Sequence, residues 1–351
     1  MRNLPWLIVV LSGCGLPVGV VPNDALPEVT ATTLAPVVAM ARVNLGRLLF
    51  FDPVLSGDRD VACATCHHPA FGYADGRALS VGVGGRGLGP SRVPSPSEPH
   101  ITPRNSPTVL NTVFNGIAAN GRTIDPAQAP MFWDSRAKSL EAQARGPLTS
   151  LAEMRGTHFT ETTLLPEVVT RLSAIADYRA RFEAAYASEG ITETTLLGAI
   201  ATFERTLVDS ESSFDRGMLS AAAARGRQVF QRSGCGACHS GPMFSDYELH
   251  ALGVPTLPGA TVDVGAGGGR FRTPSLRNVT RTAPYMQNGA LPSLDAVLEF
   301  YDQVDERLDP KLRGLRVPDR GDRADLEAFL EALSDGTFDT SVPGVPSGLA
   351  L

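Results

Sequence analysis

The chain has 351 residues, of which 43% are hydrophobic, 19% charged and 7% aromatic, a composition typical of globular proteins that excludes a disordered or collagen-like chain. The formal net charge of −6 and the scattering of the 31 basic residues give no electrostatic reason for nucleic-acid binding. No apolar run of about 18 residues or more is present, so no membrane-spanning helix is predicted.

The N-terminus resembles a bacterial lipoprotein signal peptide. Arg2 precedes a short apolar stretch at residues 4–11, and two small residues then lead to Cys14. The resemblance implies that residues 1–13 are a signal peptide that is removed and that the Cys14 thiol is acylated. An ordinary secretory signal with a chance cysteine is the alternative. Both interpretations predict that the protein is exported.

The predicted lipid at Cys14 is the one membrane attachment that we expect. Gly15 follows the cysteine, and in lipoproteins a residue other than aspartate at this position usually goes with sorting to the outer membrane. We therefore predict a periplasmic protein with an outer-membrane lipid anchor. Residues 14–42 contain proline, valine and threonine without clear periodicity and are expected to form a tether.

The predicted first domain covers residues 43–210. A proline-rich and glycine-rich stretch at residues 82–107 predicts a long irregular loop. Apolar residues at helical spacing from Val168 to Tyr186, after Pro166, predict a helix, and a second apolar stripe covers residues 196–207.

The predicted second domain covers residues 211–345. A helix at residues 219–230 leads into its cysteine motif, and a last helix is expected to be capped by Asp322 and to end at Gly336. Each half thus has a helix, a cysteine motif and a later helix, so the halves are interpreted as repeats.

Apart from Cys14, all cysteines belong to two CxxCH motifs, which are Cys63, Cys66 and His67 and then Cys235, Cys238 and His239. This spacing suits covalent c-type haem, because two thiols three positions apart each add to a vinyl group while the adjacent imidazole binds the iron. A zinc site of four cysteines is the alternative, but it leaves both histidines without a role. An export signal agrees with haem attachment outside the cytoplasm.

The chain from about residue 43 to residue 334 resembles the bacterial di-haem cytochrome c peroxidase and MauG family. The resemblance rests on both CxxCH motifs and on the segments at residues 45–47, 51–52, 103–108, 132–137, 273–278 and 283–285. It implies a mainly α fold of two cytochrome c-like helical domains with long loops, each domain holding one covalent c-type haem. It also implies an enzyme that reacts with hydrogen peroxide.

The resemblance assigns roles around the first haem. His67 is implied as the proximal ligand, and Glu153 as the group that takes a proton from the near oxygen of peroxide and returns it to the far oxygen. Gln143 and Pro147 match positions that shape the same pocket. Trp133 matches a tryptophan that carries an electron or hole between the haems.

A calcium ion between the haems is also implied. The matching positions are Asn105, through its side chain, and Thr282 and Pro284, through their backbone carbonyls. Oxygen ligands suit this hard cation.

The sixth ligand of the second haem, opposite His239, separates the branches of the family. In the peroxidases fed by small cytochromes, a methionine stands fourteen residues after a histidine in a Pro-Tyr-x-His-Asp-Gly segment. Counting fourteen residues from Gln287, which replaces that histidine, leads to Tyr301. Tyrosine there resembles MauG and its relative MbnH, and Met286 is the rival ligand. A phenolate stabilises oxidised iron, whereas a thioether favours reduced iron.

Three functions are compatible with these residues. The first is a MauG-like enzyme that uses hydrogen peroxide and a high oxidation level shared by both haems to oxidise an exported partner protein, with tryptophan the expected target. The second is a cytochrome c peroxidase that reduces hydrogen peroxide to water with electrons from a small redox cytochrome. The third is a di-haem electron carrier without enzymatic activity.

The remaining histidines carry little further information. His68, His158 and His250 are interpreted as ordinary polar or loop residues. His100 precedes Arg104 in the long loop, where some peroxidases keep a displaceable ligand, but its spacing fits poorly and a solvent-facing residue is expected. No tryptophan lies near the second motif, so a hole would reach a partner protein through Tyr247 or by direct approach.

Overall fold

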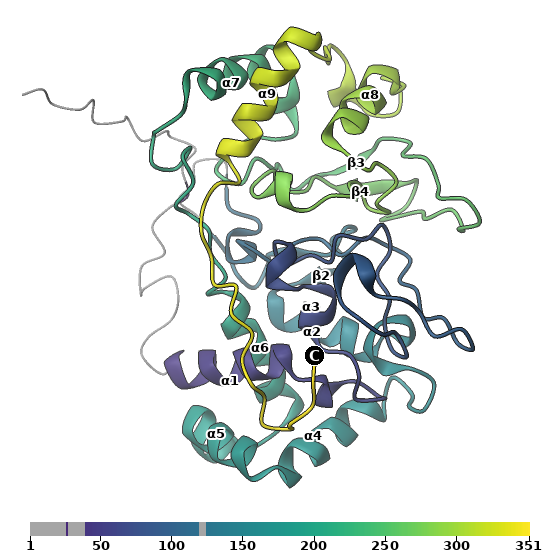
Figure 1. Cartoon of the computed structure of the whole chain (residues 1–351), viewed down its shortest axis with the longest axis vertical. Helices are drawn as coiled ribbons and strands as arrows, with labels where there is room; N and C mark the ends of the chain where they lie inside the picture. The colour runs from purple at the N-terminus through teal and green to yellow at the C-terminus, as the bar shows by residue number, and fades with distance from the viewer. Residues whose placement is uncertain (1–25, 27–38, 119–123) are drawn as a thin grey trace, which may run out of the picture.

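The computed structural model describes Leu26 and residues 39–118 and 124–351 (Figure 1). The predicted signal peptide, the predicted acylation site Cys14 and the tether except Leu26 and residues 39–42 lie outside the described residues. The described part is mainly helical with two short two-stranded sheets, which confirms the predicted fold class. None of its helices is long and apolar enough to cross a membrane.

The first half is built on the crossing of helices α1 and α6. Its helices are α1 (Ala39–Phe51), α2 (Cys63–Cys66), α3 (Leu140–Thr149), α4 (Leu164–Ala174), α5 (Ala176–Tyr186) and α6 (Glu193–Glu204). A Cβ on Gly46 of α1 would lie 1.9 Å from the Ala199 carbonyl oxygen, so only glycine allows this close approach. Leu45, Leu49 and Ile200 are buried in the core around this crossing.

The second half repeats this crossing with helices α7 and α9. Its helices are α7 (Ala221–Arg232), α8 (Leu294–Gln303) and α9 (Arg320–Ala332). A Cβ on Gly226 of α7 would lie 1.8 Å from the Asp325 carbonyl oxygen of α9. Phe214, Phe230 and Phe329 form the buried centre of this second core.

The correspondence between the halves extends to the residue register. Residues 46–50 read Gly-Arg-Leu-Leu-Phe and residues 226–230 read Gly-Arg-Gln-Val-Phe. A Cβ on Gly46 would lie 2.9 Å from the Cβ of Phe203, and one on Gly226 would lie 2.9 Å from that of Phe329. Position 203 in α6 therefore corresponds to position 329 in α9.

A second pair of segments also corresponds. Residues 107–111, Pro-Thr-Val-Leu-Asn, and residues 274–278, Pro-Ser-Leu-Arg-Asn, each end at an asparagine with left-handed backbone, φ 62° at Asn111 and 61° at Asn278. A 3₁₀ turn follows each, at Thr112–Phe114 and at Val279–Arg281. The two halves are therefore repeats in three dimensions.

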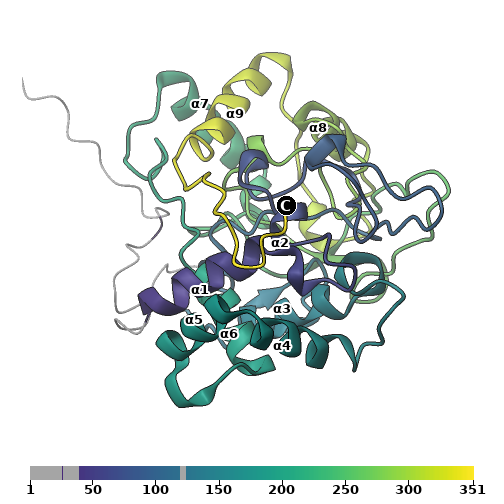
Figure 2. The same cartoon turned by 60° about the horizontal axis from the view of Figure 1, so that its bottom comes forward.

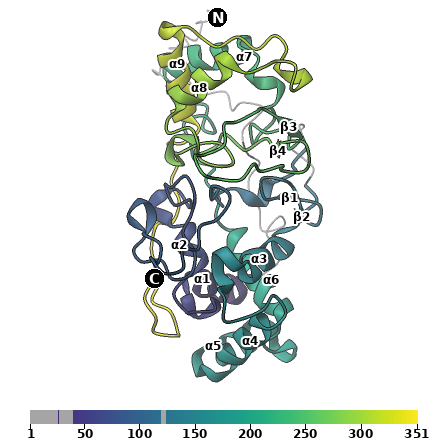
Figure 3. The ribbon, with the colours of Figure 1, turned by 90° about the vertical axis from the view of Figure 1, so that its right-hand side faces the viewer.

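The two small sheets lie between the helical halves (Figure 3). Strand β1 (Pro130–Met131) pairs antiparallel with β2 (Ala137–Lys138), and β3 (Leu249–Ala251) pairs antiparallel with β4 (Arg270–Arg272). The segment between β1 and β2 holds Trp133, so this junction brings it to the boundary between the halves.

The C-terminal segment after α9 returns to the first half and crosses it near α1 and α2 (Figures 1 and 2). The Tyr73 hydroxyl donates a hydrogen bond to the Asp339 carbonyl at 2.8 Å, and the Ser347 hydroxyl donates to the Asp52 carboxylate at 2.6 Å. Phe338 packs against the first core. This segment therefore fastens the second half to the first.

Two predicted helix details were wrong. The stripe from Val168 to Tyr186 is two helices, because Ile175 adopts an extended conformation between α4 and α5. The last helix is capped by Asp319, whose carboxylate accepts from two backbone NH groups, whereas Asp322 lies inside the first turn. Both acidic residues suit a helix N-terminus, so composition alone did not separate them.

Candidate functional site

The first CxxCH motif forms helix α2, which ends at His67. The Nδ1 atom of His67 lies 3.2 Å from the Tyr73 carbonyl oxygen. Burial lowers the pKa of His67, so the ring is kept neutral. An Nδ1–H donated to this carbonyl leaves Nε2 as the basic nitrogen, which is the state that a metal ligand requires.

The second motif repeats this arrangement in the other half. Cys235–Ala237 form a 3₁₀ turn, and Nδ1 of His239 lies 2.9 Å from the Phe244 carbonyl oxygen. Burial lowers the pKa of His239 as well. Both imidazoles are thus oriented by a backbone carbonyl shortly after their own motif.

The four motif cysteines are free thiols. Burial raises the pKa of Cys66 to about 12 and that of Cys235 to about 11, and it raises the pKa of Cys63 further. No set of potential metal ligands in the described residues joins the two motifs. The structure therefore does not assemble the alternative zinc site of four cysteines.

A cavity of about 1000 Å³ extends between the two histidines, with His67, Cys235, Cys238 and His239 in its lining. This volume is at the upper end of the range for ligand pockets. Two cysteines next to each of two neutral, oriented imidazoles, with both imidazoles lining the cavity, fit a pair of thioether-linked haems.

The predicted peroxide-site residues line the same cavity. Gln143 and Pro147 lie on α3, and Glu153 lies on the π-helical turn Leu151–Arg155 that follows it. Burial raises the pKa of Glu153, while a hydrogen bond to Ser150 and the charge of Arg136 oppose that rise. A carboxyl whose pKa is raised toward neutral pH is suited to exchange a proton with a bound substrate.

Trp133 links the two halves through its hydrogen bonds. Its indole Nε1 donates to the Asn105 carbonyl in the first half at 2.9 Å, and its own carbonyl accepts from the Arg272 NH of β4 at 2.6 Å. The ring also lines the cavity. Trp133 therefore stands where the two halves meet, which is the position that a relay between two haems would need.

An ion-pair network holds the segment next to Trp133. Arg104 contacts Asp134 at 2.8 Å and Asp263 at 2.6 Å. Asp134 also contacts Arg136 at 2.8 Å. Asp263 belongs to the second half, so these charges join the two halves beside the indole. The sequence identified the segments that contain Arg104 and Asp134, but it did not predict their ion pairs or the contact with Asp263.

Both rivals for the sixth ligand of the second haem line the cavity. Tyr301 lies on α8, and Met286 lies in a loop with φ of 72°. Burial raises the pKa of the Tyr301 phenol, and Cys238 and then Cys235 add to that rise. A bound metal ion would reverse this preference and favour the phenolate.

Two of the three predicted calcium ligands, Asn105 and Pro284, lie at hydrogen-bond distance from each other. The Asn105 amide nitrogen donates to the Arg77 carbonyl at 2.8 Å and lies 3.5 Å from the Pro284 carbonyl, and Thr282 is two residues away. Rotating the Asn105 amide by half a turn would place its oxygen, in place of its nitrogen, next to the Pro284 carbonyl. The oxygen donors fit a hard cation, and the calcium site stays a prediction.

His100 does not line the cavity. Its side chain is only 11% exposed and lies 3.6 Å from Glu98, so the expectation of a solvent-facing residue was wrong. Tyr247, the guessed exit for a hole, donates a hydrogen bond to the Phe114 carbonyl at 3.1 Å and is turned into the boundary between the halves.

His250 was expected to be an ordinary polar residue, and this was wrong. It is 7% exposed on β3 and lies 3.1 Å from Asp246 and 2.9 Å from Asp309. The Asp246 hydrogen bond contributes most to raising the pKa of His250 to about 11. The spacing of Asp246 and His250 after the second motif is a weak sequence signal, but Asp309 comes too late in the chain to be recognised.

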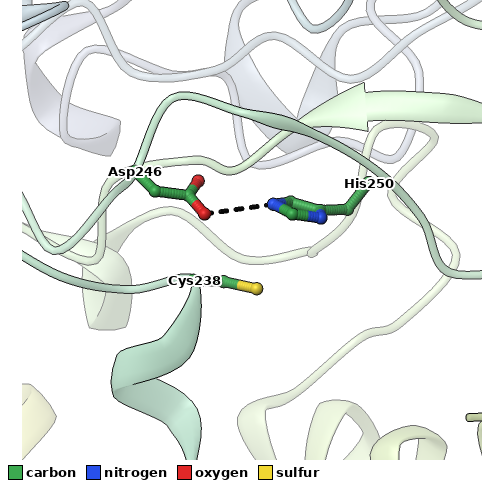
Figure 4. A group of neighbouring side chains, drawn as sticks. All are labelled: Cys238, Asp246 and His250. Atoms are coloured by element: carbon green, nitrogen blue, oxygen red, sulfur yellow. Dashed lines mark hydrogen bonds and ion pairs between the residues drawn. The ribbon is translucent and has the colours of Figure 1, made fainter. Parts of the chain in front are cut away.

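Cys238, Asp246 and His250 have potential ligand atoms within 4.8 Å of one another (Figure 4). Cys238 belongs to the CxxCH motif, and the two carboxylates already satisfy both ring nitrogens of His250. The cluster is therefore a charged contact beside the second motif.

Comparisons with known proteins agree with this geometry. Residues 40–223 match the family described as "Di-haem cytochrome c peroxidase". Methylamine utilization protein MauG of Methylorubrum extorquens is 36% identical, covering 92% of this chain and 85% of its own. Cytochrome c551 peroxidase of Pseudomonas aeruginosa is 32% identical, covering 92% and 87%.

A solved structure also shares the fold. The crystal structure of a MauG-like protein associated with microbial copper homeostasis superposes with a TM-score of 0.68 at 24% identity, covering 93% of this chain and 95% of that one. With the sequence relatives, this shows that the chain belongs to the di-haem cytochrome c peroxidase and MauG family, whose members are haem oxidoreductases of the peroxidase class.

Proposed function

We propose that this protein is a MauG-like enzyme that uses hydrogen peroxide to oxidise an exported partner protein, with tryptophan side chains as the preferred target. Two haems would be bound through thioether bonds, one at Cys63 and Cys66 and one at Cys235 and Cys238. Bound haem supplies the redox chemistry with peroxide. The protein's own residues bind the substrate, move its protons and connect the two halves.

Tyr301 carries this proposal. It lines the same cavity as His239 and both cysteines of the second motif. With His239 and Tyr301 as its two ligands, the second iron would be stabilised in its oxidised form. Such a centre is poorly suited to wait as a reduced electron donor and well suited to hold oxidising equivalents.

Glu153 is proposed as the acid-base residue for peroxide. Its carboxylate would take the proton from the oxygen nearer to the iron and return it to the farther oxygen, which leaves as water. Gln143 and Pro147 would confine the peroxide beside this carboxyl, since all three line one cavity. Trp133 would carry electrons across the boundary, supported by its hydrogen bonds to both halves.

The alternative function is a peroxidase that reduces hydrogen peroxide with electrons from a small cytochrome. Met286 favours it, because this thioether lines the same cavity as Tyr301. The similar identities to MauG and to cytochrome c551 peroxidase do not separate the two functions. A calcium ion at Asn105, Thr282 and Pro284 and a lipid anchor at Cys14 in the periplasm are proposed for either function.

Replacing each rival ligand separates these functions. In Tyr301→Met holoprotein, the ferric spectrum of the second haem is expected to change and its reduction potential to rise. Peroxide-dependent oxidation of a tryptophan-rich exported protein is expected to be lost. Met286→Leu is the matched control and should change neither. A spectrum altered by Met286→Leu and not by Tyr301→Met, with rapid turnover on reduced cytochrome, would overturn the proposal.

A further inference from the structure

Glu204 is a buried carboxyl that the proposed mechanism does not use. It is the last residue of α6 and is 5% exposed. Its Oε2 atom is fully buried and has no hydrogen-bond partner in the described structure. The adjacent Arg205 is engaged elsewhere, since it contacts Glu141 of α3 at 2.7 Å. A buried carboxyl oxygen without a partner is costly, so this residue requires an explanation.

Glu204 shares a cavity with the first haem motif. Glu204 lines the cavity that contains His67. It also acts on Cys63, whose pKa it raises more than any other charged group does. A haem attached to Cys63 would therefore lie close to this carboxyl, which is itself buried.

The second half shows that the fold does not need an acid at this position. Phe203 corresponds to Phe329 at the two helix crossings, so Glu204 corresponds to Leu330. Leu330 is also buried, 8% exposed, and lines the same cavity. An apolar residue thus satisfies this position in one repeat, and a carboxyl occupies it only beside the motif where peroxide is proposed to react.

Glu204 is held largely as the neutral acid near neutral pH. Burial raises its pKa to about 8; Arg205 opposes this rise and Glu141 adds to it. From α2, the facing titratable group is the Cys63 thiol, which thioether formation would make uncharged. Because this pKa lies so near neutral pH, a change of charge close to the carboxyl shifts it between its protonated and ionised forms.

We propose that Glu204 takes up a proton when the first haem is reduced and releases it when that haem is oxidised. One electron from a one-electron donor enters the iron, and one proton from water protonates the carboxylate, so the charge in the buried site is unchanged. The physical reason is that oxidised iron carries one more positive charge and stabilises the carboxylate, an interaction that is strong in a medium of low polarity. By linkage, the carboxylate stabilises the oxidised haem equally.

The sign of the resulting pH dependence follows. Reduction raises the pKa of Glu204 above its value in the oxidised protein. Between these two pKa values, rising pH removes the proton from the oxidised form first, so the reduction potential of the first haem falls as pH rises. This inference rests on the proposed haem at Cys63 and Cys66, but it holds for protein oxidation and for peroxide scavenging alike.

Spectroelectrochemical titration of the holoprotein tests this inference. The potential of the first haem is measured within about two pH units on either side of the pKa of about 8. In the unaltered protein it should fall by up to about 59 mV per tenfold drop in proton concentration. In Glu204→Gln it should be independent of pH in this window. Glu141→Gln, which removes a charge from the same Arg205, should keep the slope.

A second variant guards against misfolding. Glu204→Leu copies Leu330 and should also bind both haems and lose the slope. An unchanged slope in either variant would overturn the inference, and so would loss of the first haem from both, because the role would then be structural. Failure of the proposed function gives different results. Either the unaltered protein lacks the first haem, or it oxidises no partner protein although the potential of the first haem depends on pH as described.

Discussion

The two halves of the molecule share a scaffold and differ in the residues that face the cavity. Each half has a glycine at a tight helix crossing, Gly46 or Gly226, and a histidine held by a backbone carbonyl. The first half adds Glu153 and Glu204 to the cavity lining, whereas the second adds the phenol of Tyr301.

In the proposed function, this difference gives the two centres distinct tasks. The shared features orient an imidazole and place two thiols, which any c-type haem requires. In the proposed function, Glu153 would exchange protons beside the first centre, where oxygen–oxygen bond cleavage needs them. The phenol of Tyr301 would provide a ligand beside the second centre, where the proposed function needs a stable oxidised iron. A few side chains therefore determine the chemistry, and the repeat determines the geometry.

The largest expected effect concerns haem attachment, which should be separable between the halves. Removing both thiols of one motif, in Cys63→Ala/Cys66→Ala, should lower the mass of the purified protein by one haem, because each motif belongs to a half with its own core. Cys235→Ala/Cys238→Ala should do the same. Mass spectrometry and the haem spectrum measure the result. Loss of both haems from either variant would show that the halves do not form independently.

The next effect is catalytic and confined to the first half. Glu153→Gln keeps the shape of the side chain but cannot move a proton, so the rate of reaction with peroxide should fall by about 10²–10⁴. Stopped-flow absorption measures this rate. The exposed Glu161→Gln is the control, and the spectrum of the second haem should not change. A rate within about twofold of the unaltered protein would assign the proton transfer to another group.

The smallest effect tests whether the two helix crossings are equivalent. Gly46→Ala and Gly226→Ala each force a Cβ into a backbone carbonyl, at 1.9 and 1.8 Å, so each should lower the free energy of unfolding by about 1–3 kcal/mol or more. Gly344→Ala, with nothing within 4 Å, should change it little. Denaturant unfolding of the holoprotein provides the comparison. A destabilisation by only one of the two substitutions would mean that the two crossings contribute unequally to the stability of the protein.

The sequence alone determined the features that depend on short-range spacing. The CxxCH motifs predict where thiols and imidazoles lie, because two intervening residues set the separation of the cysteines and the histidine follows directly. Apolar periodicity predicted the helical fold, although it did not detect the break at Ile175. The family resemblance led to Glu153, Trp133 and Tyr301, which the structure places around one cavity.

Only the tertiary structure decided which distant groups meet. His250 looks like any histidine in a loop until folding brings Asp309 to its ring. Glu204 looks like a helix-end carboxylate until folding buries it and brings its charge near enough to act on Cys63. The correspondence of Glu204 with Leu330 likewise appears only when the two helix crossings are compared. Burial and partner choice depend on contacts between residues far apart in the chain, and local patterns do not encode those contacts.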